Sequence, residues 1–148
     1  MKWPNDVYLG GSKVCGILSE SVTGWRDRLV VGVGINVNNR GQGTGDRGQA
    51  VALVEWDGLV RDLTGVLLAV LDQFDRRWSE LLAGGFAPLA EEYRRRCLLT
   101  GKMVTIEQPG ARQVVGVCQG IDEEGLLVLR TEMGKERVAS GTVVRWEG

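Results

Sequence analysis

Residues 29–38 read Leu-Val-Val-Gly-Val-Gly-Ile-Asn-Val-Asn, and this stretch is the clearest β-strand in the sequence. Because side chains alternate across a strand, one face is predicted to carry only branched apolar side chains: Val31, Val33, Ile35 and Val37. The other face carries two glycines followed by two amides: Gly32, Gly34, Asn36 and Asn38. This second face is nearly bare backbone, which suits close packing, a bulge or a flat ligand whose purine edge meets an amide.

Two shorter stretches precede this strand. Residues 2–6 read Lys-Trp-Pro-Asn-Asp, whose composition suits an ordinary turn. Residues 7–20 predict a β-hairpin with its turn at Gly10-Gly11-Ser12 and a second strand that starts at Lys13. A lysine in that place is most often a solvated residue of a sheet edge.

In the rest of the chain, the spacing of apolar residues is first that of helices and then that of strands. Apolar residues recur at helical spacing over 59–82, which predicts a helix that Asp57 caps and that Gly84-Gly85 ends. A second helix is predicted over 88–99, with Arg94-Arg95-Arg96 on a solvated face. The later short strands, over 103–106, 113–118, 126–129 and 137–146, predict a small β-barrel. A barrel of this size has little core of its own, so we expect it to pack on the first domain.

The glycine-rich residues 40–48 predict a mobile loop, because they show no hydrophobic period. We expect a domain boundary near Thr100.

Composition excludes several classes of protein. The 148 residues are 43% hydrophobic and 25% charged, with a net charge of −1, which is ordinary for a globular chain and does not favour a nucleic-acid partner. The absence of histidine excludes Ser-His-Asp and Cys-His catalysis and any zinc site with His ligands. Three widely spaced cysteines, Cys15, Cys97 and Cys118, indicate reduced thiols and a cytoplasmic location. No apolar run is long enough to cross a membrane. The phosphate-loop pattern G-x-x-x-x-G-K-[ST] is absent, and the dinucleotide-binding pattern G-x-G-x-x-G does not fit, because no helix is predicted directly after the glycines of residues 40–48.

Taken together, residues 2–6, 13–18 and 32–38 resemble the central motifs of biotin–protein ligases in order and spacing. The two helices and the ending Gly141-Thr142-Val143-Val144-Arg145 follow the same family plan. The resemblance implies an α+β fold in two parts. Residues 1–100 would be the C-terminal part of a catalytic domain related to class II aminoacyl-tRNA synthetases, and residues 101–148 would be a small SH3-like barrel.

The resemblance also implies a two-step reaction with biotin, ATP and Mg²⁺. Biotin and ATP give biotinyl-5′-AMP, and a lysine of a biotin carboxyl carrier domain then attacks it. Lys13 matches the catalytic lysine, a point charge that can hold the biotin carboxylate and the α-phosphate. The implied positions that contact biotin or the adenylate are Asn5, Asp6, Lys13, Gly16, Gly32, Gly34, Asn36 and Arg145. Asp6 is also a possible Mg²⁺ ligand, Asn36 is expected to contact adenine, and a homodimer is possible.

The sequence departs from the family pattern in one feature, a loop that contacts biotin and the adenylate. Family members carry a Gly/Arg-rich loop that closes over biotin and the adenylate phosphate, before the part that this chain resembles. The sequence does not contain that loop, so we expect a truncated ligase. The alternative is a non-catalytic remnant that binds nucleotide or a carrier protein without ligation. A lipoate ligase is a third option, which the biotin-type motifs disfavour.

Overall fold

A computed structural model describes residues 1–21, 24, 28–39 and 50–147. It consists of two compact units. One comprises residues 5–72, and the other comprises residues 1–4 together with residues 73–148. The mobile loop predicted over residues 40–48 lies outside the described residues.

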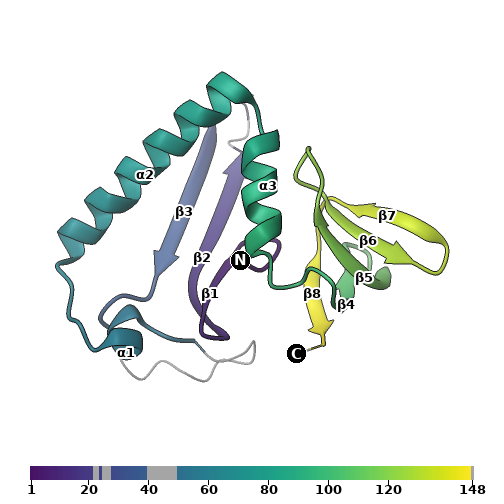
Figure 1. The fold of residues 1–148 in the computed structure, drawn as a ribbon, viewed down its shortest axis with the longest axis horizontal. Coiled ribbons are helices and arrows are strands. Elements are labelled where there is room, and N and C mark those ends of the chain that lie inside the picture. Colours follow the sequence, from purple (N-terminus) through teal and green to yellow (C-terminus); the bar gives the residue numbers. More distant parts are fainter. Residues whose placement is uncertain (22–23, 25–27, 40–49, 148) are drawn as a thin grey trace. The chain divides into compact units, whose positions relative to one another are not determined.

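The first unit contains a three-stranded antiparallel sheet in the order β1-β2-β3 (Figure 1). Its strands are β1 (Asp6–Leu9), β2 (Ser12–Ser21) and β3 (Leu29–Ile35). The predicted hairpin is confirmed, and its turn uses Gly10 and Gly11 at φ 56° and 84°, a region that favours glycine. The third strand ends at Ile35 and not at Asn38. Beyond Ile35 the carbonyls of Asn36 and Val37 accept from the amides of Leu53 and Val54 instead of from another strand.

The helices differ from the prediction at their starts. A short helix that the periodicity did not predict, α1 (Leu53–Asp57), precedes α2 (Leu63–Gly84). Asp57 therefore does not cap the long helix, because it ends α1 and Gly58 follows in the left-handed region at φ 78°. Asp62 takes the capping role, since its carboxylate accepts from the backbone amide of Gly65 at 2.8 Å. The next helix, α3 (Ala87–Arg96), ends three residues before the predicted Leu99.

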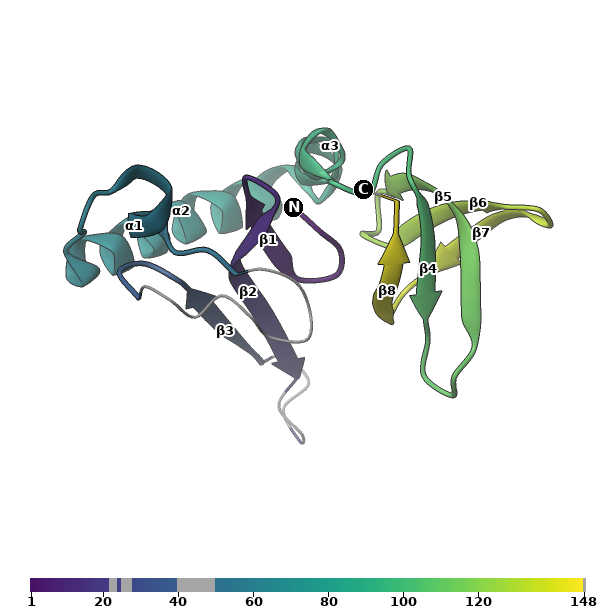
Figure 2. The same ribbon diagram turned by 90° about the horizontal axis from the view of Figure 1, so that it is seen from below.

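The second unit contains a five-stranded antiparallel sheet in the order β7-β6-β5-β4-β8, which Figure 2 shows as a curved sheet. Its strands are β4 (Met103–Glu107), β5 (Gln113–Ile121), β6 (Leu127–Thr131), β7 (Gly134–Val138) and β8 (Thr142–Trp146). The single strand predicted over 137–146 is thus wrong. Strand β7 ends at Val138 and β8 begins at Thr142. Between them lies Gly141, where a Cβ atom would lie only 2.7 Å from the Glu107 carbonyl oxygen.

The core of the second unit lies under this five-stranded sheet. Ile106, Leu127, Leu129 and Val138 are fully buried in it. Three residues from before the sheet complete the same core: Trp3, Ala90 and Leu99. These strands therefore do not form their core alone, and the expectation that they pack on a first domain stays a prediction. The boundary near Thr100 and the SH3-like classification stay predictions.

The three-arginine cluster does not lie wholly on a solvated face. Arg95 and Arg96 are exposed, but the Arg94 guanidinium donates to the Ile121 carbonyl oxygen at 2.7 Å. In the part of the chain that the structure describes, no helix combines the length and apolar character that a membrane span requires.

Candidate functional site

The candidate site is a row of residues that crosses all three strands of the first sheet. Asp6 on β1 pairs with Gly16 on β2, and Gly16 pairs with Gly34 on β3. The next pair on the same face is Leu18 and Gly32. Because side chains alternate along each strand, these positions form one continuous surface, in which the two glycines of β3 leave the backbone uncovered.

Lys13 reaches over this row. Its ammonium forms an ion pair with the Asp6 carboxylate, and its side chain is 41% exposed against 13% for Asp6. A Cβ atom at Gly16 would lie 3.2 Å from Lys13 Nζ and 3.8 Å from the Asp6 carboxylate. Any side chain at position 16 would therefore push the ammonium aside, so glycine there lets a cation lie directly above the strand.

The surface beside this ion pair is hollowed. A cavity of about 480 Å³ is lined by Asn5 and six residues of the two neighbouring strands: Gly16, Ile17, Leu18, Gly32, Val33 and Gly34. Cβ atoms at Gly32 and Gly34 would meet nothing closer than carbonyl oxygens at 3.8 Å. The two glycines therefore keep open a space that larger side chains would fill. Among the described residues, no segment packs closely against the glycine face of β3, which was one of the predicted uses of that face.

Backbone hydrogen bonds fix the strand segment that carries Lys13. The Lys13 carbonyl accepts from the Val51 amide at 2.9 Å, and the neighbouring Val14 carbonyl accepts from the Asn36 amide at 2.9 Å. On the other side, the Asn5 carbonyl accepts from the Ile17 amide at 2.8 Å. The backbone around Lys13 is thus hydrogen-bonded to the segments on both sides of it.

The two amides at the end of the glycine strand have different roles. Asn38 is structural, because its side chain donates to the Arg61 carbonyl at 2.7 Å and accepts from the Arg61 amide at 3.0 Å. The Asn36 side chain is half-buried, and its oxygen accepts from the Asn39 amide group at 3.0 Å. Asn36 does not line the cavity above Gly34, so its contact with adenine stays a prediction.

Of the predicted site residues, the structure brings Asn5, Asp6, Lys13, Gly16, Gly32 and Gly34 together in the first unit. Arg145 lies on β8 in the second unit, where its side chain is exposed. Its role at the nucleotide stays a prediction.

Three residues that line the cavity were not predicted from the sequence: Ile17, Leu18 and Val33. Leu18 could have been found, because it lies two residues after Gly16 on a strand. For Ile17 and Val33 no signal was available, since strand alternation places them on the opposite face.

Nothing in the described part of the chain forms a cluster of three or more metal-ligating His, Cys, Asp or Glu side chains. Asp6 offers a single carboxylate, and Lys13 already pairs with it. A Mg²⁺ ion usually binds through one or two carboxylates together with substrate phosphates. Coordination of Mg²⁺ by Asp6 therefore stays a prediction.

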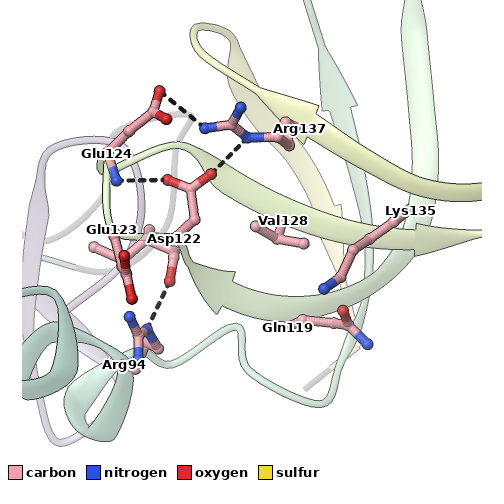
Figure 3. A pocket seen from close by; sticks show the side chains of 9 residues that line it. Arg94, Gln119, Asp122, Glu123, Glu124, Val128, Lys135 and Arg137 are labelled. Atoms are coloured by element: carbon pink, nitrogen blue, oxygen red, sulfur yellow. Dashed lines mark hydrogen bonds and ion pairs between the residues drawn. The ribbon is translucent and has the colours of Figure 1, made fainter. Parts of the chain in front are cut away.

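A second cavity, of about 450 Å³, lies in the other unit at the turn between β5 and β6 (Figure 3). Several of its charged side chains form ion pairs. Arg137 pairs with Asp122 and Glu124, and Arg94 pairs with Glu91. This cavity contains none of the predicted site residues.

Comparison with known proteins agrees with this geometry. Residues 1–38 match the family described as "Biotin/lipoate A/B protein ligase family", and residues 99–146 match "Biotin protein ligase C terminal domain". The chain is 33% identical to the biotin–[acetyl-CoA-carboxylase] ligase of Paracoccus denitrificans, over 97% of this chain and 61% of that protein. It is 30% identical to the bifunctional ligase/repressor BirA of Bacillus spizizenii, over 97% of this chain and 45% of that protein.

A solved structure extends the likeness to three dimensions. The biotin protein ligase from Aquifex aeolicus in complex with biotin and ATP matches with a TM-score of 0.83 and 32% identity, over 95% of this chain and 59% of that one. The chain spans about half the length of the curated relatives that it matches. Both family matches, the relatives and the solved structure agree: along nearly its whole length the chain is similar to biotin protein ligases.

Proposed function

We propose that this chain takes part in the ATP-dependent attachment of biotin to a lysine of a biotin carboxyl carrier domain. The observation that carries the proposal is the Lys13–Asp6 ion pair, which lies over Gly16 beside an open cavity floored by Gly32 and Gly34. The likeness to a ligase solved with biotin and ATP supports the same ligands for this site.

In the first step, a carboxylate oxygen of biotin attacks the α-phosphorus of ATP. A mixed anhydride, biotinyl-5′-AMP, forms and pyrophosphate leaves. Negative charge accumulates on the oxygens around phosphorus during this step. The Lys13 ammonium, which lies against the cavity-lining Gly16, is the cation that can stabilise this charge. Asp6 acts as a positioning residue, because its ion pair holds the ammonium above Gly16.

In the second step, the amine of the carrier lysine attacks the acyl carbon of the anhydride. An amide bond forms, and AMP leaves. The bare strand surface at Gly32 and Gly34 allows the adenylate to lie against the backbone, with Asn5 offering an amide group at the cavity wall. Asn36 and Arg145 are proposed to contact the adenine and the rest of the nucleotide, and Mg²⁺ to accompany the ATP phosphates.

The test incubates the chain with biotin, MgATP and a purified carrier domain, and measures pyrophosphate release and carrier biotinylation separately. Lys13→Ala is expected to lower both by at least about 1000-fold, because it removes the cation at the reacting phosphorus. Lys135→Ala is the matched control, since Lys135 lies on β7 of the other unit. Equal rates for the two variants would contradict the role of Lys13.

The alternative function, binding without ligation, has a different outcome. It predicts that a folded chain binds ATP or the carrier domain but releases no pyrophosphate. Replacing biotin by lipoate in the same assay tests the third option.

A further inference from the structure

Helix α1 contacts the β1–β2 hairpin through one aromatic side chain. The ring of Trp56 lies against the hairpin turn at Gly10, since a Cβ atom at Gly10 would lie only 2.1 Å from Trp56 Cζ3 and 2.7 Å from Cη2. The ring therefore fills the space that any other residue at position 10 would need for its side chain. The rest of the indole is accessible, because Trp56 as a whole is 57% exposed.

The turn under this ring leads directly to the ammonium group of the candidate site. Gly10 has φ 56° and Gly11 has φ 84°, a region that favours glycine. Lys13 follows Gly10 by three residues, at the second position of β2. Because the connection is so short, a change in the direction of the turn also moves the backbone from which the Lys13 side chain starts.

The segment that leads into α1 contacts the same strand at a second point. Ala50 forms a parallel bridge with Lys13, and the Val51 amide donates to the Lys13 carbonyl at 2.9 Å. Residues 50–56 therefore contact the hairpin twice, at the strand through Lys13 and at the turn through Gly10.

Helix α1 is itself fixed, so it can support the hairpin. The Leu53 amide donates to the Asn36 carbonyl at 3.0 Å, just beyond the end of β3. The Glu55 carboxylate accepts from the Ala52 amide at 2.8 Å, which is the reciprocal bond of a capping box. Val54 anchors the helix from below, with 2% of its surface exposed. Trp56 thus extends from a helix whose own place is set by the strand that carries Asn36.

We propose that Trp56 is a positioning residue for Lys13. Its ring holds the hairpin turn, so that the Lys13 ammonium lies above Gly16 beside the cavity. The inference rests on the proposed function, in which Lys13 stabilises the charge at the reacting phosphorus. Trp56 is not among the residues that line the cavity, so it acts through the hairpin and touches no ligand there.

Steady-state kinetics of pyrophosphate release test this role. Trp56→Ala is expected to lower kcat by about tenfold to 100-fold, because displacing a reacting group by up to about 1 Å has this cost. The KM values for ATP and biotin should stay within about twofold, since Trp56 makes no contact with substrate. Trp56→Phe keeps an aromatic ring on Gly10 and should recover most of the lost rate.

Trp78→Ala is the matched control. Trp78 is 48% exposed, close to the value for Trp56, but it lies on α2 in the second unit. Its removal should therefore leave kcat unchanged. Circular dichroism confirms that each variant is folded.

Amide hydrogen exchange followed by NMR measures the contact without any ligand. Trp56→Ala should speed exchange of the amides of residues 12–16 by about tenfold, because the hairpin then opens more often. Trp78→Ala should leave these amides unchanged. An equal acceleration throughout the first unit would show a general loss of stability and would contradict a positioning role.

Gly10→Ala tests the same contact from the other side. The new Cβ atom would displace the Trp56 ring, so adding Trp56→Ala to Gly10→Ala should lower kcat no further. The inference is overturned if Trp56→Ala leaves exchange of residues 12–16 unchanged, if it keeps the kcat of the unchanged chain, or if the two substitutions are additive. A chain that releases no pyrophosphate would instead contradict the proposed function, and hydrogen exchange would still decide whether Trp56 holds the hairpin.

Discussion

The two sheets of this protein differ in what covers them. In the five-stranded sheet, the inward side chains of Ile106 and Leu129 are fully buried. In the three-stranded sheet, by contrast, the apolar side chains of Leu29, Val31 and Val33 on β3 are between 38% and 59% exposed. The same residue types therefore form a closed core in one sheet and an open surface in the other.

This difference separates stability from chemistry. The five-stranded sheet has the interior that resists unfolding, because burial of apolar side chains is the main favourable contribution to folding. The three-stranded sheet has little interior among the described residues, but its glycine face carries the Lys13–Asp6 ion pair and the cavity. Variants in the three-stranded sheet should change ligand chemistry, and variants in the five-stranded sheet should change the free energy of unfolding.

The largest effect is expected from Leu129→Ala in the buried sheet. It should lower the free energy of unfolding by about 2–5 kcal/mol, because it leaves a cavity in a closed core. Val31→Ala in the open sheet should cost less than about 1 kcal/mol. Urea unfolding of both variants measures the difference. Equal losses would show that Val31 is as well covered in solution as Leu129.

Gly34→Val tests whether the three-stranded sheet carries the ligand chemistry. A Cβ atom at Gly34 would meet no atom closer than 3.8 Å, so we expect the strand to accommodate valine, whose side chain would fill the cavity floor. Adenylate formation should fall by about 100-fold, as expected when a bound substrate is displaced by about 1 Å, with the urea midpoint nearly unchanged. Gly84→Val is the control, since it adds the same atoms to open space at the end of α2. A loss of stability without a loss of activity would argue against the site.

A smaller effect is expected from Gly141→Ala, between β7 and β8. The new Cβ atom would lie 2.7 Å from the Glu107 carbonyl oxygen, and position 141 has φ 149°, where glycine is favoured. We expect a cost of about 1–3 kcal/mol from overpacking and backbone strain. Thermal unfolding measures it, and an unchanged midpoint would show that β4 and β8 can separate at this point without cost.

The smallest effect concerns thiol reactivity. The lowered pKa of Cys97, about 6, means that its rate of alkylation by iodoacetamide should be near its maximum at pH 7 and should fall as the pH drops through 6. Burial raises the pKa of Cys15 in the other sheet, so its rate should still be rising above pH 8. Near pH 7 we expect Cys97 to react about tenfold faster than Cys15. The same pH profile for both residues would contradict the hydrogen-bond pattern around Cys97.

Local chemistry explains which elements could be predicted. The hairpin was found because two glycines supply the turn that its strands require, and the strand 29–35 because its branched residues alternate with glycines. The start of α2 was misplaced because the apolar spacing continues backward through Leu59, which cannot reveal that Gly58 ends a separate helix. Strand 137–146 was read as one strand because its composition does not show that β4 approaches too closely at Gly141.

The sequence by itself determined the resemblance to biotin protein ligases and which residues are candidates for the site, because motifs of fixed spacing within one hairpin and one strand require no knowledge of distant contacts. Only the tertiary structure decided which of them meet. Pairing of three strands placed Asp6, Gly16 and Gly34 in one row, with Lys13 above it. The physical reason is that strand register and core packing depend on residues far apart in the chain.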